Sequence, residues 1–161
     1  MAELLIVYHS RTGGSRQMAE AAADGARAEI PTRLIAAEAA GPADLLAADG
    51  YIFCAPENLA ALSGAMKEFF DRCYYPVLGQ LNGRAYALMI CAGSDGEGAA
   101  RQAARIAQGW RLKPVQAPII ICTHAQTTEA ILADKAIPET ELQDCRALGQ
   151  ALGAGLAMGI Y

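Results

Sequence analysis

The chain has 161 residues and a formal net charge of −4, which predicts one domain with a core large enough to need no disulfide or structural metal. A hydrophobic fraction of 53% with 19% charged residues excludes intrinsic disorder. The 13 Lys and Arg residues are outnumbered by 17 Asp and Glu and form no basic stripe, so we expect no nucleic-acid partner.

The cysteines and the chain ends indicate the compartment. Five cysteines occur without any C-x-x-C spacing, which favours reduced thiols over a disulfide framework or a metal site. Met1–Tyr8 lacks the cationic start of a signal peptide. Ala147–Tyr161 is uncharged apart from the chain end but too short and glycine-rich to cross a bilayer. We therefore expect a cytoplasmic protein without a membrane partner.

Short apolar runs alternate with segments of helical period along the chain. In chain order, the apolar runs predict strands at Leu4–Tyr8, Arg33–Ala36, Tyr51–Ala55, Ala85–Cys91 and Val115–Cys122. The intervening segments predict helices at about Ser15–Ala28, Pro42–Ala48, Ser63–Tyr74, Glu97–Trp110 and Pro138–Tyr161. The connection Thr127–Lys135 is long enough for a helical turn or two.

Two of these helices carry further packing signals. Lys67 stands four residues before Asp71, and Glu68 four before Arg72, which predicts two ion pairs on the outer face of the third helix. The last helix contains a series of glycines despite a cost of roughly 1 kcal/mol for each, which predicts close packing on the sheet. These glycines are Gly149, Gly153, Gly155 and Gly159.

The strict alternation of strands and helices predicts an α/β fold. We expect a doubly wound five-stranded parallel sheet with strand order 2-1-3-4-5 and helices on both faces. In such sheets ligands bind beyond the carboxyl ends of the strands, at the switch point between the first and third strands. The loops that follow Tyr8, Ala55, Cys91 and Cys122 are therefore the candidate site.

The first of these loops, His9–Ser15, joins a buried strand to a helix amino terminus. Two glycines allow the backbone to curl, and three hydroxyls add donors to the main-chain amides. The loop is neither a Walker A motif nor a G-x-G-x-x-G turn. It predicts a cradle for a single phosphomonoester, and the alternative is an ordinary turn in which Ser15 caps the helix.

Three segments resemble a known family. Ser10–Ser15 resembles the FMN-phosphate loop of flavodoxin-like proteins, usually written S/T-x-T-G-x-T. Pro56–Arg72 resembles the second flavin loop and the following helix in the branch that contains NAD(P)H-dependent FMN reductases and quinone reductases. Ala92–Gly96 resembles the loop after the fourth strand, which flanks the flavin.

The resemblance implies that residues 1–161 form a single flavodoxin-like FMN-binding domain. It implies an oxidoreductase that passes electrons from NADPH or NADH through FMN to a quinone or another small-molecule acceptor, with no metal. The implied cofactor-binding residues are Ser10, Arg11, Thr12, Gly13, Gly14, Ser15, Pro56, Glu57, Asn58, Leu59, Ala92, Gly93, Ser94 and Asp95. The family often assembles so that a neighbouring subunit covers the flavin, which leaves a homodimer or homotetramer open.

Several of these residues have two interpretations. Leu59 stands where many relatives place an aromatic side chain, so it would leave one flavin face open. Asp95 is either a carboxylate near flavin N1 or a plain turn residue. Glu57 is either a flavin-edge residue or a solvated carboxylate, and Arg11 either supports a phosphate or is solvated. His124 follows the fifth strand and is either a proton donor or a surface histidine.

Two other functions compete with the reductase. A flavodoxin-type electron carrier would bind FMN without a nicotinamide site of its own, but such carriers are usually far more acidic than −4. A flavin-free α/β module is the third possibility. Tyr8–Ser10 offers no acidic cluster for a phosphoacceptor receiver, and no cysteine begins a Cys-x5-Arg phosphatase motif.

Overall fold

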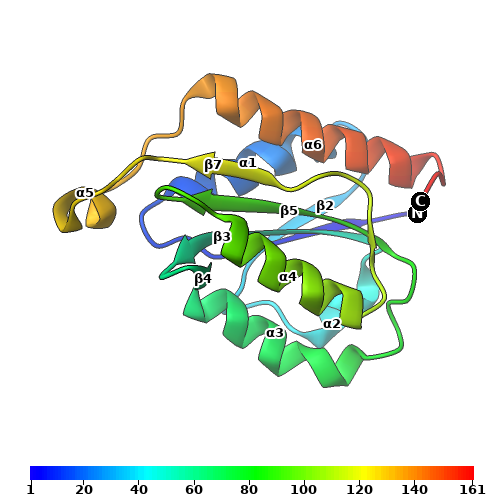
Figure 1. The fold of residues 1–161 in the computed structure, drawn as a ribbon. Coiled ribbons are helices and arrows are strands. Elements are labelled where there is room, and N and C mark those ends of the chain that lie inside the picture. Colours follow the sequence, from blue (N-terminus) through cyan, green and yellow to red (C-terminus); the bar gives the residue numbers. More distant parts are fainter.

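The centre of the fold is a parallel sheet, seen in a computed structural model that describes residues 1–161 (Figure 1). Its four main strands are β1 (Leu4–Tyr8), β2 (Thr32–Ala36), β3 (Gly50–Asn58) and β5 (Ala85–Ala92). The hydrogen-bonded order is β2-β1-β3-β5-β6, so β1 lies between β2 and β3. This order confirms the predicted arrangement. After β2 the chain crosses back over β1 to form β3, so the switch point of the sheet lies between β1 and β3.

The predicted fifth strand, Val115–Cys122, is wrong in its bounds. Two short strands run along the free edge of β5 instead: β6 (Lys113–Pro114) beside its start and β7 (Ile119–Cys122) beside its end. The intervening segment contains Pro118, which has no N–H group to donate to the ladder. The chain therefore leaves the sheet after Val115 and pairs with β5 again from Ile119.

The sequence did not predict the two-residue strand β4 (Ala61–Leu62), which pairs antiparallel with the end of β3. Glu57 pairs with Leu62, and Asn58 pairs with Ala61. The third strand consequently runs past its predicted end at Ala55 and turns back as a hairpin. This hairpin lies at the carboxyl edge of the sheet, where the candidate site was predicted.

Two layers of helices cover the sheet (Figure 1). Helices α1 (Gly14–Arg27) and α6 (Glu139–Ala157) pack on one face. Helices α2 (Pro42–Ala47), α3 (Gly64–Val77) and α4 (Glu97–Gly109) pack on the other. None of the helices combines the length and the apolar character that crossing a bilayer requires.

The predicted helices are confirmed with small shifts at their ends. The two ion pairs predicted on α3 form, with 2.6 Å from Lys67 Nζ to Asp71 Oδ1 and 3.2 Å from Arg72 Nε to Glu68 Oε2. The short helix expected in the long connection is α5 (Thr128–Leu132). Helix α6 ends at Ala157 rather than at the chain end, because Gly159 adopts a left-handed φ of 69°.

The glycines of α6 serve a contact other than the predicted one. A Cβ at Gly149 would overlap the Ala22 carbonyl of α1, and one at Gly25 of α1 would overlap the Arg146 carbonyl of α6. The prediction of packing on the sheet is therefore corrected, since these glycines bring α6 against α1. Gly155 instead faces the side chain of Tyr161 at the chain end.

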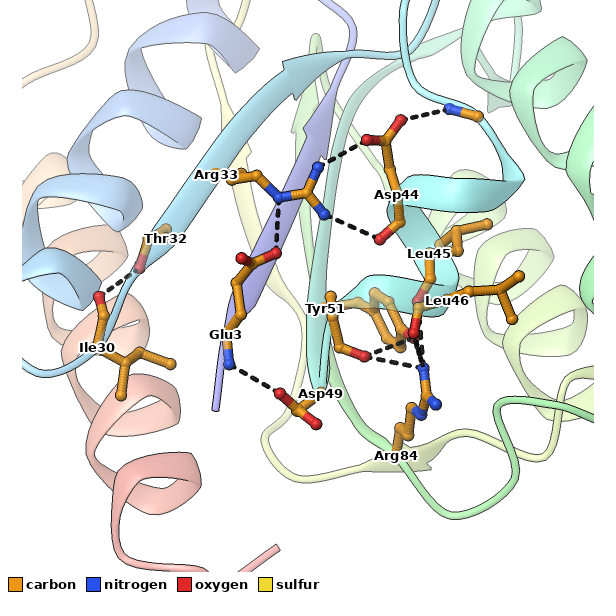
Figure 2. Close-up of polar contacts among 12 residues, drawn as sticks. Glu3, Ile30, Thr32, Arg33, Asp44, Leu45, Leu46, Asp49, Tyr51 and Arg84 are labelled. Atoms are coloured by element: carbon orange, nitrogen blue, oxygen red, sulfur yellow. Dashed lines mark hydrogen bonds and ion pairs between the residues drawn. The ribbon is translucent and has the colours of Figure 1, made fainter. Parts of the chain in front are cut away.

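A polar network closes the opposite end of the sheet, near the amino ends of the strands (Figure 2). The Arg33 guanidinium of β2 lies 2.6 Å from both Glu3 Oε1 and Asp44 Oδ1. Arg84 donates to the carbonyl of Ala48 at 2.8 Å and lies 3.0 Å from the hydroxyl of Tyr51. The five charged groups drawn in Figure 2 are thus engaged within the framework: Glu3, Arg33, Asp44, Asp49 and Arg84.

The close approach of α1 and α6 makes a prediction about stability. Gly149→Ala is expected to lower the free energy of unfolding by about 1–3 kcal/mol, because the new methyl group meets rigid backbone. Gly155→Ala in the same helix is the matched control, since its methyl group meets only the flexible Tyr161 side chain. Urea unfolding followed by circular dichroism measures both variants, and equal stabilities would contradict the contact.

Candidate functional site

The carboxyl ends of β1, β3, β5 and β7 meet at one edge of the sheet, and two cavities open there. The larger, about 460 Å³, lies beside the first loop and is lined by Tyr8–Gly13 together with Arg16, Ala36, Glu38, Asp134 and Lys135. The smaller, about 70 Å³, lies among the other predicted loops. It is lined by Thr12, Pro56, Glu57, Asn58, Cys91, Ala92, Gly93, Thr123, Ala125, Ile131 and Lys135. Only Thr12 and Lys135 line both cavities.

The first loop curls tightly before α1 begins. Gly13 has a left-handed φ of 96°, and its amide donates to Ser10 Oγ at 3.0 Å. A Cβ at Gly14 would come within 2.6 Å of the Cys91 sulfur, so this position must be glycine for the loop to lie so close to β5. The amides of Ser10, Arg11 and Thr12 donate to no group of the protein. These amides are available to an anion at the start of α1.

Ser15 lies in the first turn of α1 and is only 2% exposed. Its Oγ is a buried polar side-chain atom without any hydrogen-bond partner. Gly13, not Ser15, occupies the capping position of the helix, so the alternative interpretation of Ser15 as a cap is wrong. A buried hydroxyl without a partner costs free energy, so Ser15 is a candidate donor to a ligand, although it lines neither cavity.

The second loop contains Pro56–Leu59, and in the structure the carboxylate of Glu57 accepts two hydrogen bonds from the start of α4. Its Oε1 accepts from the Gly96 amide at 2.8 Å, and its Oε2 accepts from the Ala99 amide at 3.0 Å. The carboxylate thus caps the amino end of α4 from another element. This finding corrects the interpretation of Glu57 as a solvated loop carboxylate.

Leu59 and Ala60 form the turn between β3 and β4, and both adopt left-handed backbone, with φ of 53° and 66°. Hairpins of this kind usually place Asn and Gly at these positions, because a Cβ there is strained. The Leu59 side chain is fully exposed. The Ala60 carbonyl packs where a Cβ at Gly98 of α4 would stand, so neighbouring structure holds the strained turn in place.

The third loop and the end of β7 hold the remaining predicted residues. Ser94 and Asp95 are exposed, and Asp95 Oδ1 accepts from the Glu97 amide at 3.4 Å, as a turn residue does. His124 is also exposed, with a left-handed φ of 60°, and its amide donates to the Gly93 carbonyl at 2.8 Å. The imidazole of His124 makes no hydrogen bond and lines neither cavity.

Cys91 forms part of the wall of the smaller cavity. Burial raises the pKa of its thiol to about 11, against the opposing effect of the Lys135 ammonium. At neutral pH the group is therefore a protonated, apolar thiol and no nucleophile. The part of the wall that Cys91 contributes is therefore uncharged.

Sequence reasoning missed Gln17 and Lys135, which join the first loop to the segment before α6. The Gln17 amide group donates to the carbonyls of Gly13 at 2.9 Å and Lys135 at 2.7 Å, and its Oε1 accepts from the Ile137 amide at 3.0 Å. Lys135 also donates from its own amide to the Thr12 carbonyl at 2.9 Å. Contacts between residues more than 100 positions apart leave no signal in a local pattern.

His9 links the first loop to the start of α3. Its Nδ1 lies 2.8 Å from Ser63 Oγ, and its Nε2 lies 3.6 Å from Glu38 Oε1. Ser63 is 1% exposed, so its hydroxyl is not accessible as a nucleophile. This contact connects the first loop to the residue that follows the second loop and precedes α3.

Comparison with known proteins identifies the family. The sequence model of the family described as NADPH-dependent FMN reductase matches residues 37–127, which is more than half of the chain. The chain belongs to this family. The match includes the second and third loops and His124 but not the first loop, which lies before it.

Two curated relatives support membership of the FMN reductase family. A protein named flavodoxin from Aquifex aeolicus is 39% identical over 61% of this chain and 52% of its own length. A protein named NAD(P)H dehydrogenase (quinone) from Acidithiobacillus ferrooxidans is 34% identical over 45% of this chain and 47% of its own length. The chain spans about half the length of the curated relatives it matches.

The solved structures establish the fold of this FMN reductase family member. A flavodoxin from the domain Archaea superposes with a TM-score of 0.78 over 96% of this chain and 98% of its own, at 18% sequence identity. The predicted flavodoxin-like fold is confirmed.

The cap on α4 makes a second stability prediction. Glu57→Ala is expected to lower the free energy of unfolding by about 1–2 kcal/mol, because two amides at the helix start lose their acceptor. Glu97→Ala is the control, since it removes a carboxylate from the same helix end without removing a hydrogen bond to the helix. Chemical denaturation compares the two variants. An unchanged free energy of unfolding in Glu57→Ala would show that the two hydrogen bonds of the cap do not stabilise the protein.

Proposed function

We propose that this protein is an FMN-binding oxidoreductase that passes electrons from NADPH or NADH to a quinone or another small-molecule acceptor. In this proposal residues 1–161 act as one FMN-binding domain in the cytoplasm. All five cysteines are free thiols, which suits a reducing compartment. Assembly into a homodimer or homotetramer stays a prediction.

One observation carries the proposal. The first loop contains hydrogen-bond donors that no group of the protein uses, and these donors are available to an anion. The amides of Ser10, Arg11 and Thr12 are free, and the buried Ser15 hydroxyl has no partner. All of them lie at the start of α1, where the helix dipole favours negative charge. A phosphomonoester is the ligand this arrangement fits, because it accepts from several donors at once.

The residues present therefore fit FMN. The phosphate would be held by Ser10–Ser15, and the main chain of the second and third loops would supply donors to the ring edges, around Asn58 and Gly93. When bound, FMN supplies the hydride chemistry. The chain's own part is to bind and orient it, and the neutral wall at Cys91 adds no competing nucleophile.

Family membership and the names of two relatives support the redox part of the proposal. The family is described as NADPH-dependent FMN reductase, and two relatives are named NAD(P)H dehydrogenase (quinone). An electron carrier is the alternative, favoured by the relative named flavodoxin. No aromatic side chain lines the smaller cavity beside the second loop, which leaves access for a nicotinamide or a quinone.

Ser15→Ala separates ligand binding from stability. We expect the variant to bind FMN about tenfold more weakly, because one donor to the phosphate is lost. The same change is expected to leave the free protein equally stable or more stable, since it removes a buried hydroxyl that has no partner. Fluorescence titration with FMN and thermal unfolding measure the two effects.

Thr32→Val is the control for this variant, because it also removes a hydroxyl. The Thr32 hydroxyl on β2 makes one hydrogen bond, to the Ile30 carbonyl, and lies away from the site. It should leave FMN affinity within about twofold of the wild type. Unchanged FMN affinity in Ser15→Ala would contradict the assignment of the first loop to the phosphate.

Steady-state turnover distinguishes the reductase from the carrier. The FMN-loaded protein is expected to oxidise NADPH or NADH when a soluble quinone is present, and to show saturation in the nicotinamide. A protein that binds FMN but consumes neither nicotinamide with any acceptor would be the carrier. A protein that binds no FMN would refute both.

A further inference from the structure

The connection between β7 and α6 carries a helix that nothing buries. Helix α5 has no buried residue, and Ile131 and Leu132 expose about half of their side chains. The helix projects from the rest of the molecule beyond the ends of the strands (Figure 1). Ile131 nevertheless lines the smaller cavity, so α5 forms one wall of the candidate ring site.

A single side chain holds the end of this helix. The Lys135 ammonium donates to the carbonyls of Ala130 at 2.8 Å, Ile131 at 2.9 Å and Ala133 at 2.6 Å. It also lies 3.4 Å from Thr12 Oγ1 in the first loop. An ammonium group has three protons to donate, so the three carbonyls use all of them.

The backbone of Lys135 is anchored separately from its side chain. Its amide donates to the Thr12 carbonyl at 2.9 Å, and its carbonyl accepts from Gln17 Nε2 at 2.7 Å. The residue therefore stays beside the first loop whichever partners the ammonium takes. A phosphate held by that loop would lie next to a cation, and an ion pair with a phosphate is stronger than a bond to a neutral carbonyl.

The other cations near the loop are less well placed. Arg16 lines the larger cavity, but its guanidinium is paired with Glu20 at 3.2 Å. Arg11 also lines this cavity, but it is exposed and makes no hydrogen bond or ion pair. Lys135 alone is both fixed by its backbone and in contact with Thr12.

We propose that Lys135 is a specificity residue of the phosphate site, which selects the phosphorylated flavin over riboflavin and releases the end of α5 when it binds the phosphate. This inference rests on the proposed function. Because all three protons are in use, a bond to a phosphate oxygen requires the ammonium to give up at least one carbonyl of α5.

The walls of the smaller cavity differ in how much packing holds them in place. Of the lining elements, α5 is the one with no buried residue, so it is the wall whose displacement disrupts the least packing.

Titration with FMN and with riboflavin tests the specificity. Lys135→Gln is expected to weaken FMN binding about tenfold and to leave riboflavin binding within about twofold, because only FMN carries the phosphate. Lys135→Arg keeps the charge and should restore most of the FMN affinity. Lys113→Gln makes the same change of net charge on β6, at the opposite end of the sheet, and should alter neither affinity.

The outcomes distinguish this inference from the proposed function. A wild-type protein that binds no FMN would overturn both. A wild-type protein that binds FMN, with Lys135→Gln weakening FMN and riboflavin equally or neither of them, would overturn the specificity role alone. Loss of the FMN preference in Lys135→Gln and its recovery in Lys135→Arg would establish the role.

Hydrogen exchange with inorganic phosphate tests the release of α5. Saturating phosphate is expected to speed amide exchange in residues 128–133 of the wild type about threefold or more, because the carbonyls lose their donor. In Lys135→Gln these amides should already exchange fast and should not respond to phosphate. Exchange in the wild type that slows or stays unchanged would overturn the release step.

Discussion

The close packing of α1 is the constraint on which the rest of the site depends. Three positions around this helix admit no side chain: Gly14 against the Cys91 sulfur, Gly25 against α6, and Gly149 of α6 against α1. Without these glycines the helix would stand farther from both the sheet and α6. Its amino end would then lie away from β5, and the Ser15 hydroxyl would not be buried beside the loop.

The site at this helix end relies on dipoles more than on charges. The free amides of Ser10, Arg11 and Thr12 and the start of α1 present partial positive charge at the larger cavity, and the unpartnered Ser15 hydroxyl is buried in the next turn of chain. The ionised groups nearby are largely committed elsewhere, with Glu57 on α4 and Arg16 on Glu20. Dipoles held in place by the backbone bind an anion without rearranging the first loop, which suits a cofactor that must be held in one orientation. The one side chain proposed to change partners is Lys135.

Sequence reasoning recovered the strand order, the helices and the three loops at the sheet edge, because these follow from local period and from the rules of parallel sheets. It missed what depends on distant partners. The β3–β4 hairpin forms around Leu59 and Ala60, which are not typical turn residues, and α4 supports it through Gly98. Glu57 resembled a solvated carboxylate because its two partners follow it by about forty residues. Pro118 cannot donate a hydrogen bond to the ladder, and the local apolar pattern around it does not show that the edge strand divides there into β6 and β7.

The residues missed in this way are those that connect the loops to one another. His9 joins the first loop to α3, Gln17 joins it to the segment before α6, and Glu57 joins the second loop to the third through α4. Each is a polar side chain whose partners come from another element. The motifs therefore identify which loops meet, whereas these linking side chains determine how rigidly they meet. Helix α5 is the exception, since it has no buried residue and Lys135 provides much of its attachment. It is therefore the part of the site edge that a ligand can displace.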